Sequence, residues 1–182
     1  MNTILIEDDG TKKTSELLAD LKALFPVWSY YSDTDLDRAF FPVKTSRTFN
    51  NTQEADENTA NKSAEDLAKD GKQYMTLRER LIYEAMWFKE NGTHLDEKYI
   101  TLCAGSRYRY GRVPGVDWDS DYGKLYIDWR GPQDADDGLR ARAAVSLDTS
   151  PLIPSDLESR VKRLEEAVFK VVKKRGRPRK AA

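Results

Sequence analysis

The residue types that most often catalyse reactions are scarce among these 182 residues. The single cysteine, Cys103, lies between Leu102 and Ala104, and this apolar setting favours a buried structural thiol over a nucleophile. The single histidine, His94, comes just after Gly92-Thr93, where we expect a turn. One histidine also excludes a His-rich zinc site within one chain. Neither residue predicts catalysis.

A group of aspartates is the remaining candidate for a cation site. Asp134, Asp136 and Asp137 lie close together, but their spacing departs from that of an EF-hand loop. Gly105-Ser106-Arg107 does not have the pattern of a phosphate-binding glycine loop. We interpret the aspartates as a solvated acidic turn, and we predict a protein that is not an enzyme and needs no cofactor and no metal.

The clearest chemistry lies at the carboxyl end of the chain. Seven of the 30 lysines and arginines occur from Lys170 onward, while all 31 acidic residues precede it, which leaves residues 1–169 with a net charge of −8. An acidic body with a short basic tail is typical of an electrostatic tether to a polyanion. The predicted DNA-binding residues are Lys173, Lys174, Arg175, Gly176, Arg177, Pro178, Arg179 and Lys180.

The core of this tail, Arg175-Gly176-Arg177-Pro178 with basic residues on both sides, resembles an AT-hook. The resemblance covers residues 173–180 and implies binding in the minor groove of A·T-rich duplex DNA. The narrow groove of an A-tract attracts arginine through its negative potential, and Gly176 lets the backbone approach the groove floor. Pro178 keeps the chain extended. The alternative is a generic basic tail that binds polyanions without discrimination.

A second basic and aromatic segment runs from Arg107 to Arg112 and is expected in or near a loop. Alternating arginines and tyrosines could recognise single-stranded nucleic acid or a peptide. Four nearby aromatic residues could extend this surface or, as we expect for the tryptophans, cover the hydrophobic core: Trp118, Tyr122, Tyr126 and Trp129. The candidate partner-binding residues are Arg107, Tyr108, Arg109, Tyr110 and Arg112.

Several short segments at about residues 99–147 are similar to the closing segment of C-type-lectin-like ligand-binding domains. These segments are Gly105-Ser106-Arg107, Val113-Pro114-Gly115-Val116-Asp117-Trp118, Leu125-Tyr126-Ile127-Asp128-Trp129 and Gly138-Leu139-Arg140-Ala141-Arg142. The resemblance implies ligand binding without enzymatic activity. It also implies that residues 107–137 face a partner rather than the core.

The elements that position these residues begin with an N-terminal helical and aromatic segment, residues 1–43. One face of the expected helix carries Leu17, Leu18, Leu21, Leu24 and Phe25. Thr14 or Ser15 is expected to cap this helix, and Pro26 to end it. Residues 44–75 are mostly polar, so they predict a flexible, disordered linker.

Residues 76–148 are expected to form an α+β core domain. Thr76 and Glu79 form a capping box at the start of a helix that Asn91-Gly92 ends. The apolar period then changes from 3.6 to 2, which predicts a small antiparallel β-meander packed on the helix.

Within this meander, Val116-Asp117-Trp118 and Ile127-Asp128-Trp129 suit two arms of a hairpin with both tryptophans on one face. Residues 139–147 alternate as a strand does, but their alanines and arginines also favour a helix. Both readings of that segment stay open.

Residues 155–172 are expected to form a coiled-coil-like helix between the core domain and the tail, which spans residues 173–182. Its apolar residues repeat at steps of four and three: Leu157, Val161, Leu164, Val168 and Val171. This spacing predicts self-association, which would hold two or more tails together. The alternative is that the helix docks on the chain's own meander.

Composition agrees with a chain that is packed only in part, since 39% of its residues are hydrophobic and 34% are charged. A run of about 18 apolar residues, which a membrane span needs, is absent, and the amino terminus lacks the pattern of a secretion signal. A single cysteine fits a reducing compartment.

These observations predict a cytoplasmic, nucleoid-associated adaptor, such as a phage or bacterial accessory protein. Its tail would bind A·T-rich duplex DNA, its last helix would form a homo-oligomer, and its core domain would bind an unidentified protein. The alternative is a protein-binding module with a generic basic tail, such as a virion component or an inhibitor of a host factor.

Overall fold

The computed structural model describes residues 2–145, and these form an α+β fold. The predicted helix at residues 155–172 and the basic tail at 173–182 lie outside the described residues. The described helices are α1 (Thr14–Lys22), α2 (Asp33–Ala39), α3 (Ala64–Lys69) and α4 (Leu77–Asn91). The strands are β1 (Thr3–Asp8), β2 (Val27–Ser29), β3 (Thr45–Asn50), β4 (Ile100–Leu102), β5 (Val113–Asp119), β6 (Lys124–Arg130) and β7 (Leu139–Arg140).

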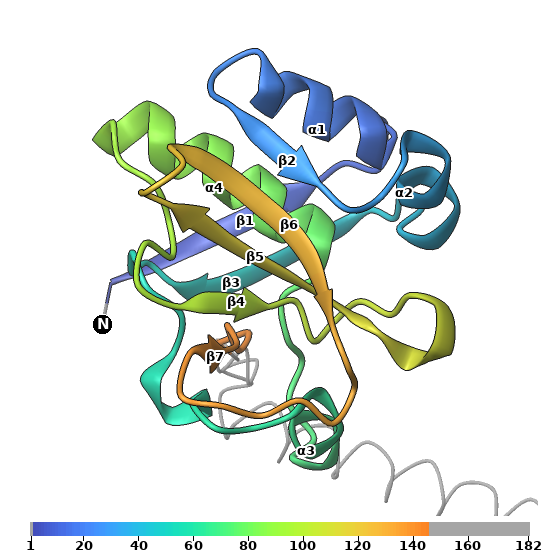
Figure 1. Ribbon diagram of the computed structural model, residues 1–182, viewed down its shortest axis with the longest axis vertical. Helices are drawn as coiled ribbons and strands as arrows, with labels where there is room; N and C mark the ends of the chain where they lie inside the picture. The colour runs from blue at the N-terminus through green and yellow to red at the C-terminus, as the bar shows by residue number, and fades with distance from the viewer. Residues whose placement is uncertain (1, 146–182) are drawn as a thin grey trace, which may run out of the picture. The chain divides into compact units, whose positions relative to one another are not determined.

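The larger sheet has five strands in the order β2-β6-β5-β4-β7 (Figure 1). Its centre is the predicted hairpin of β5 and β6, in which Val116 lies opposite Ile127. Trp118 and Trp129 share the inner face and pack against the core, as expected. The sheet is mixed rather than a purely antiparallel meander, because β2 joins β6 in parallel and β7 joins β4 in parallel.

The central helix, α4, forms as its sequence predicts. Thr76 accepts a hydrogen bond from the backbone nitrogen of Glu79, and the Glu79 side chain accepts one from the backbone of Thr76. Gly92 ends the helix at φ 68°, in the left-handed region that glycine adopts without strain.

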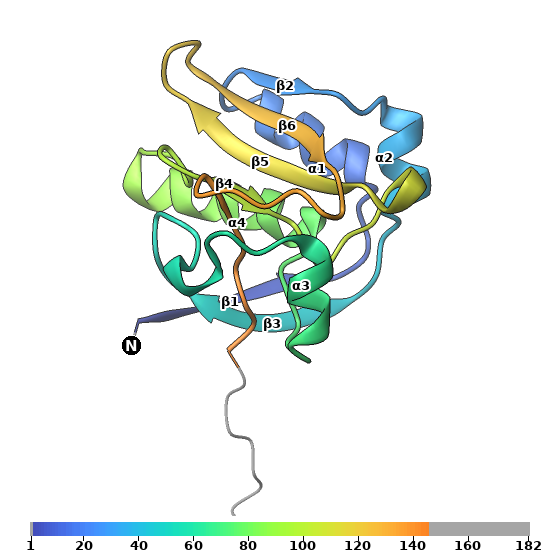
Figure 2. The same cartoon turned by 60° about the horizontal axis from the view of Figure 1, so that its bottom comes forward.

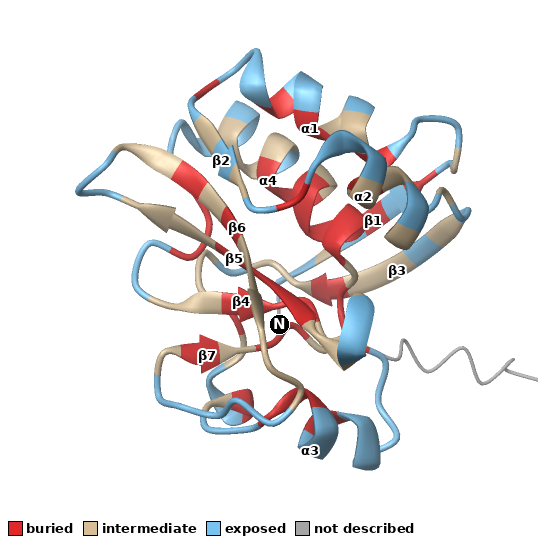
Figure 3. Cartoon of the chain, turned by 45° about the vertical axis from the view of Figure 1, so that its right-hand side comes forward, coloured by how far each residue is buried: buried red, intermediate tan, exposed pale blue. Residues whose placement is uncertain are grey.

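Helix α4 lies between two sheets, as Figure 2 shows. On one side, Leu77 and Leu81 join α1, α2 and the inner face of β5 and β6 in the largest core cluster. On the other side, Tyr83 packs with Ile6 and Phe49 of the two-stranded sheet formed by β1 and β3. The first half of the helix is therefore buried, as the red residues of α4 in Figure 3 show, while its last residues are exposed.

The prediction of a disordered linker at residues 44–75 is wrong. Strand β3 pairs with β1 over six residues, and α3 buries Ala64 and Leu67 against Leu102 of β4. Polar side chains replace the missing apolar ones by bonding to distant backbone. Thr59 Oγ1, for example, accepts a hydrogen bond from the backbone nitrogen of Ala141 at 2.7 Å.

The N-terminal segment, residues 1–43, shares the core of the later residues. Leu18, Leu21 and Phe25 pack with Leu77 of α4. Leu18 and Leu21 of α1 are buried and Leu17 is partly buried, as predicted, but the helix ends at Lys22, before Pro26, and Leu24 is 42% exposed. The N-cap of α1 is Lys13, and neither Thr14 nor Ser15 caps it. Thr14 is instead buried, where its hydroxyl donates to the backbone oxygen of Phe40.

The segment after residue 139 is extended, so the strand reading of residues 139–147 is correct as far as Val145. After β7, bridges join Ala141 to Asp56, Ala143 to Tyr74 and Ala144 to Phe49. These bridges attach the chain to the segment that was expected to be a linker.

Candidate functional site

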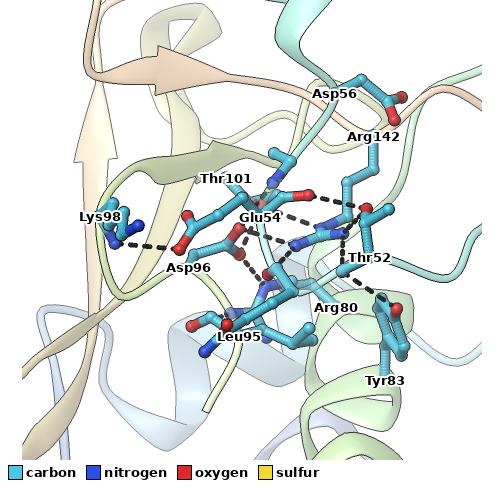
Figure 4. A network of polar contacts seen from close by, with 12 residues as sticks. Thr52, Glu54, Asp56, Arg80, Tyr83, Leu95, Asp96, Lys98, Thr101 and Arg142 are labelled. Atoms are coloured by element: carbon cyan, nitrogen blue, oxygen red, sulfur yellow. Dashed lines mark hydrogen bonds and ion pairs between the residues drawn. The ribbon is translucent and has the colours of Figure 1, made fainter.

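The charged residues at the centre of the fold form a buried network (Figure 4). Arg80 donates from Nε to Asp96 Oδ2 at 2.9 Å and from Nη1 to Glu84 Oε2 at 2.6 Å. Arg142 donates from Nη2 to Asp96 Oδ1 at 2.7 Å, and Thr101 donates to Asp96 Oδ2 at 2.6 Å. Asp96 thus compensates two guanidinium groups in the protein interior.

This network joins four parts of the chain, and its role is structural. Arg80 comes from α4, Thr101 from β4 and Arg142 from the segment after β7, while the backbone oxygens of Thr52 and Gln53 accept bonds from Arg142 at 2.9 and 2.7 Å. Removing any one of these buried charged groups would leave another without its partner, at a cost in free energy. The network therefore stabilises the folded arrangement of these segments.

His94 lies in the connection between α4 and β4, where its sequence context predicts a turn. It is 8% exposed, its Nδ1 lies 2.8 Å from Glu84 Oε1, and its ring stacks on Trp118 with 6° between the planes. The ring fills a place in the aromatic core and extends the buried network.

Cys103 is fully buried, as predicted, and burial raises the pKa of its thiol to about 12. A thiol with such a pKa is protonated at neutral pH and is a poor nucleophile.

The carboxylates of the acidic turn accept hydrogen bonds from backbone nitrogens of the same turn: Asp134 accepts from Gly131 and Asp136 from Gly138. Among residues 2–145, no cluster of His, Cys, Asp and Glu side chains could hold a metal ion.

The arginine and tyrosine loop, residues 107–112, is the described feature that best fits a binding site. Tyr108 closes it by donating from its backbone nitrogen to the Arg112 oxygen at 2.7 Å. Tyr110, at the tip, is 91% exposed and has a φ of 59°. A tyrosine in the left-handed region is strained, and such strain often occurs at functional sites.

The five candidate residues of this loop divide into two groups. Tyr108 anchors the loop, since its ring lies edge-on to Tyr31 at 5.0 Å. Arg112 lies over the ring of Trp129 at 3.7 Å, a cation–π contact. Arg107, Arg109 and Tyr110 are exposed, so these three are the residues that the fold leaves accessible for a partner.

The exposed arginines of the loop lie beside α2, which contributes Asp35 and Arg38. Arg38, Arg107 and Arg109 line a hollow of about 270 Å³, and Asp35 is the one acidic residue in its lining. Arg109 Nη2 lies 3.1 Å from Asp35 Oδ1. A hydrogen bond from Ser32 and the charge of Arg109 lower the pKa of Asp35, so three positive charges face one ionised carboxylate. We call this the arginine hollow.

A second hollow of about 190 Å³ adjoins the first and shares Ala39 and Arg107 with it. Its lining includes Phe41, which is 62% exposed, and Val43, which is 49% exposed. We call this the apolar hollow. Arg38, Phe41 and Val43 were not predicted as candidate site residues, because they lie far from the loop in sequence.

The largest hollow described, about 580 Å³, lies beside β1 and α1. Its exposed charges are mixed, with Glu7 and Asp9 opposed by Lys12 and Lys44, so its net charge indicates no particular ligand.

The expectation that all of residues 107–137 face a partner is wrong, because Val116, Leu125 and Ile127 are fully buried.

None of the helices within residues 2–145 is long and apolar enough to cross a membrane. No family model, no curated protein and no solved structure matches this chain. A functional proposal therefore rests on the residues and their geometry.

Proposed function

We propose that this protein is a non-enzymatic, DNA-associated adaptor of the cytoplasmic nucleoid. Its basic tail, Lys173 to Lys180, binds A·T-rich duplex DNA in the minor groove, and its apolar heptad residues between Leu157 and Val171 hold copies of the chain together. The folded body then presents the arginine and tyrosine loop to a second macromolecule.

One structural observation carries the binding role of the body. The Tyr110 ring is 91% exposed in a strained backbone conformation, beside a hollow lined by three arginines. Exposing an aromatic ring and holding like charges together both oppose folding, so a binding role gives a reason for their presence. The buried charges, by contrast, are compensated within the fold.

The residue types of the tail support its DNA-binding role. Arg175 and Arg177 suit the negative potential of a narrow A-tract groove, and Gly176 between them permits close approach. A single tail gives weak binding, on the order of 10⁻⁴–10⁻⁶ M for non-specific contacts. Self-association would add a factor of about 10²–10⁴ by avidity.

Fluorescence anisotropy tests the tail. The full chain should bind an A·T-rich duplex more tightly than a G·C-rich duplex of equal length, and the variant Arg175→Ala/Arg177→Ala should lose that preference. The matched control Lys22→Ala/Lys89→Ala removes two exposed positive charges elsewhere and should keep it. Equal affinity of the unaltered chain for both duplexes would overturn groove reading.

A protein-binding module with a generic basic tail is the second candidate, and the charge of the body favours it. Residues 1–145 carry 26 acidic and 20 basic side chains, so the body as a whole repels nucleic acid. Under this alternative, a chain that ends at Lys170 keeps its partner from a host lysate, and DNA binding shows no preference for A·T pairs.

A further inference from the structure

We infer that the arginine hollow and the apolar hollow together bind single-stranded nucleic acid, with a phosphate held by the arginines and an unpaired base against Phe41 and Val43. This inference rests on the proposed function, because it names the ligand of the body in a DNA-associated protein. The binding of single strands by the hollows can be tested independently of the binding of A·T-rich duplex DNA by the tail.

The first argument is unused hydrogen-bonding capacity. Arg107 donates from Nη1 to the oxygens of Ala104 and Ser106 at 2.7 and 2.8 Å, and from Nη2 to Ala64 at 3.4 Å. These bonds fix the guanidinium and leave its Nε–H without an acceptor among residues 2–145. The Arg38 side chain makes no hydrogen bond or ion pair within the same range. Free, oriented guanidinium donors suit a phosphate.

The second argument is charge. Three arginines and one ionised aspartate give the hollow a net positive charge of two, in a body whose net charge is negative. An anion approaching the body is therefore favoured at this place and opposed over much of the remaining surface. The site selects a ligand that carries negative charge in a compact group, as a phosphate does.

The third argument is the pair of exposed aromatic rings. Phe41 lines the hollow that shares Arg107, and Tyr110 follows Arg109 directly in sequence. Stacking of a base on an aromatic side chain is favourable, and it needs a base that is not stacked inside a duplex. Alternating phosphates and unpaired bases match alternating arginines and aromatic rings, which favours a single strand over a phosphopeptide.

The fourth argument is rigidity, because binding loses less entropy at a preformed site. Ser32 caps α2 by accepting from the Asp35 nitrogen, and the Asp35 carboxylate receives Arg109. Tyr108 is held between the rings of Tyr31 and Phe40. The arginines thus project from a helix and a closed loop that both pack on the core.

The test uses the full chain with all seven basic residues of the tail, from Lys170 to Lys180, changed to alanine, so that the tail contributes little. The probe is a fluorescein-labelled dT12 oligonucleotide followed by anisotropy. We expect Arg38→Ala/Arg109→Ala to weaken its binding about tenfold, because it removes two of the three positive charges that would contact a phosphate. Phe41→Ala should weaken it as well, although it removes no charge.

The matched control, Lys22→Ala/Lys89→Ala, removes the same charge from α1 and from the far end of α4. An equal loss in this control would show that only overall charge matters and would overturn the site. Complete loss of dT12 binding in the tail variant alone would also overturn it, while leaving the A·T-duplex result intact.

A phosphoserine peptide of equal charge provides the last arm. If the peptide displaces dT12 at lower concentration than unlabelled dT12 does, the hollow is a phosphopeptide site and the nucleic-acid assignment is overturned. If A·T preference fails in the unaltered chain while Arg38→Ala/Arg109→Ala still weakens dT12 binding, the tail proposal fails and this inference stands.

Discussion

The arginines of this protein occupy two contrasting settings. Arg78, Arg80 and Arg142 are buried, and each is matched by a carboxylate: Arg78, for instance, donates to both oxygens of Asp8 at 2.6 and 2.8 Å. Arg38 and Arg109 are exposed around a hollow with one carboxylate between them. The same side chain thus occurs with its donors satisfied by carboxylates in the interior and with donors left available at the surface.

This difference has a direct energetic meaning. Removing a partner from a buried ion pair leaves a charge in a medium that solvates it poorly, whereas removing an exposed arginine leaves its surroundings hydrated. Stability should therefore respond strongly to substitutions in the buried network and weakly to those around the arginine hollow, while binding should respond in the opposite way.

The largest effect is expected for Asp96→Ala. This change leaves both Arg80 and Arg142 without their shared carboxylate, so we expect the free energy of unfolding to fall by about 3–5 kcal/mol. Urea denaturation measures it. The exposed Asp121→Ala is the control and should change stability by less than about 0.5 kcal/mol. Equal effects of the two substitutions would erase the contrast between the two regions.

A smaller, pH-dependent effect is expected at Asp117, a partly buried carboxyl of β5. Burial raises its pKa to about 6. The Asp117 carboxyl therefore stays protonated in the folded state at pH values where the same carboxyl is ionised in the unfolded chain. Its contribution to stability therefore falls as pH rises from about 4 to 6. With allowance for its partial exposure, we expect a decline of about 1 kcal/mol that Asp117→Asn removes.

Paired urea titrations at pH 4.5 and 7 measure this difference. The useful quantity is the gap between Asp117→Asn and the unaltered chain, because other carboxyls titrate equally in both. A gap that stays constant with pH would show that Asp117 is hydrated and unperturbed.

A modest gain in stability is expected for Tyr110→Gly. Glycine adopts the φ of 59° without strain, so unfolding should require about 0.5–1 kcal/mol more free energy, while binding to dT12 weakens through loss of the ring. Thermal unfolding followed by circular dichroism measures the first change. A variant that binds as tightly as the unaltered chain would remove Tyr110 from the binding surface.

The smallest effect on stability is expected for Arg38→Ala. Because this side chain has no ion-pair partner among residues 2–145, its loss should change the free energy of unfolding by at most about 0.5 kcal/mol. A loss above about 1.5 kcal/mol in urea would mean that Arg38 belongs to the structural set.

Features set by local sequence were predictable. The capping box of Thr76 and Glu79 identified α4, and the alternation around Trp118 and Trp129 identified the hairpin. The burial of Cys103 followed from its apolar neighbours. In each case the evidence lies within a few residues of the element itself, where helix and strand periods are visible.

Features set by distant contacts were not predictable in this way. Residues 44–75 were predicted to be disordered because they contain few apolar side chains. The hydrogen bonds that join them to distant parts of the chain are not visible in the sequence; one example is the Ala143 nitrogen, which donates to Asp56 at 2.7 Å. The loop residues Arg107 to Arg112 were proposed as a candidate site from their types alone. Arg38 and Phe41 were not among the candidates, because only the fold brings α2 beside that loop.

The pairing of β2 with β6 has a consequence for how the chain acquires its fold. Val27 lies opposite Leu125, so the earliest strand of the larger sheet must wait for nearly a hundred later residues to emerge during translation. At about 5–20 residues per second, that delay is roughly 5–20 s. Such high contact order slows folding and exposes Phe25 and Val27 meanwhile, which makes the nascent chain a candidate client for chaperones.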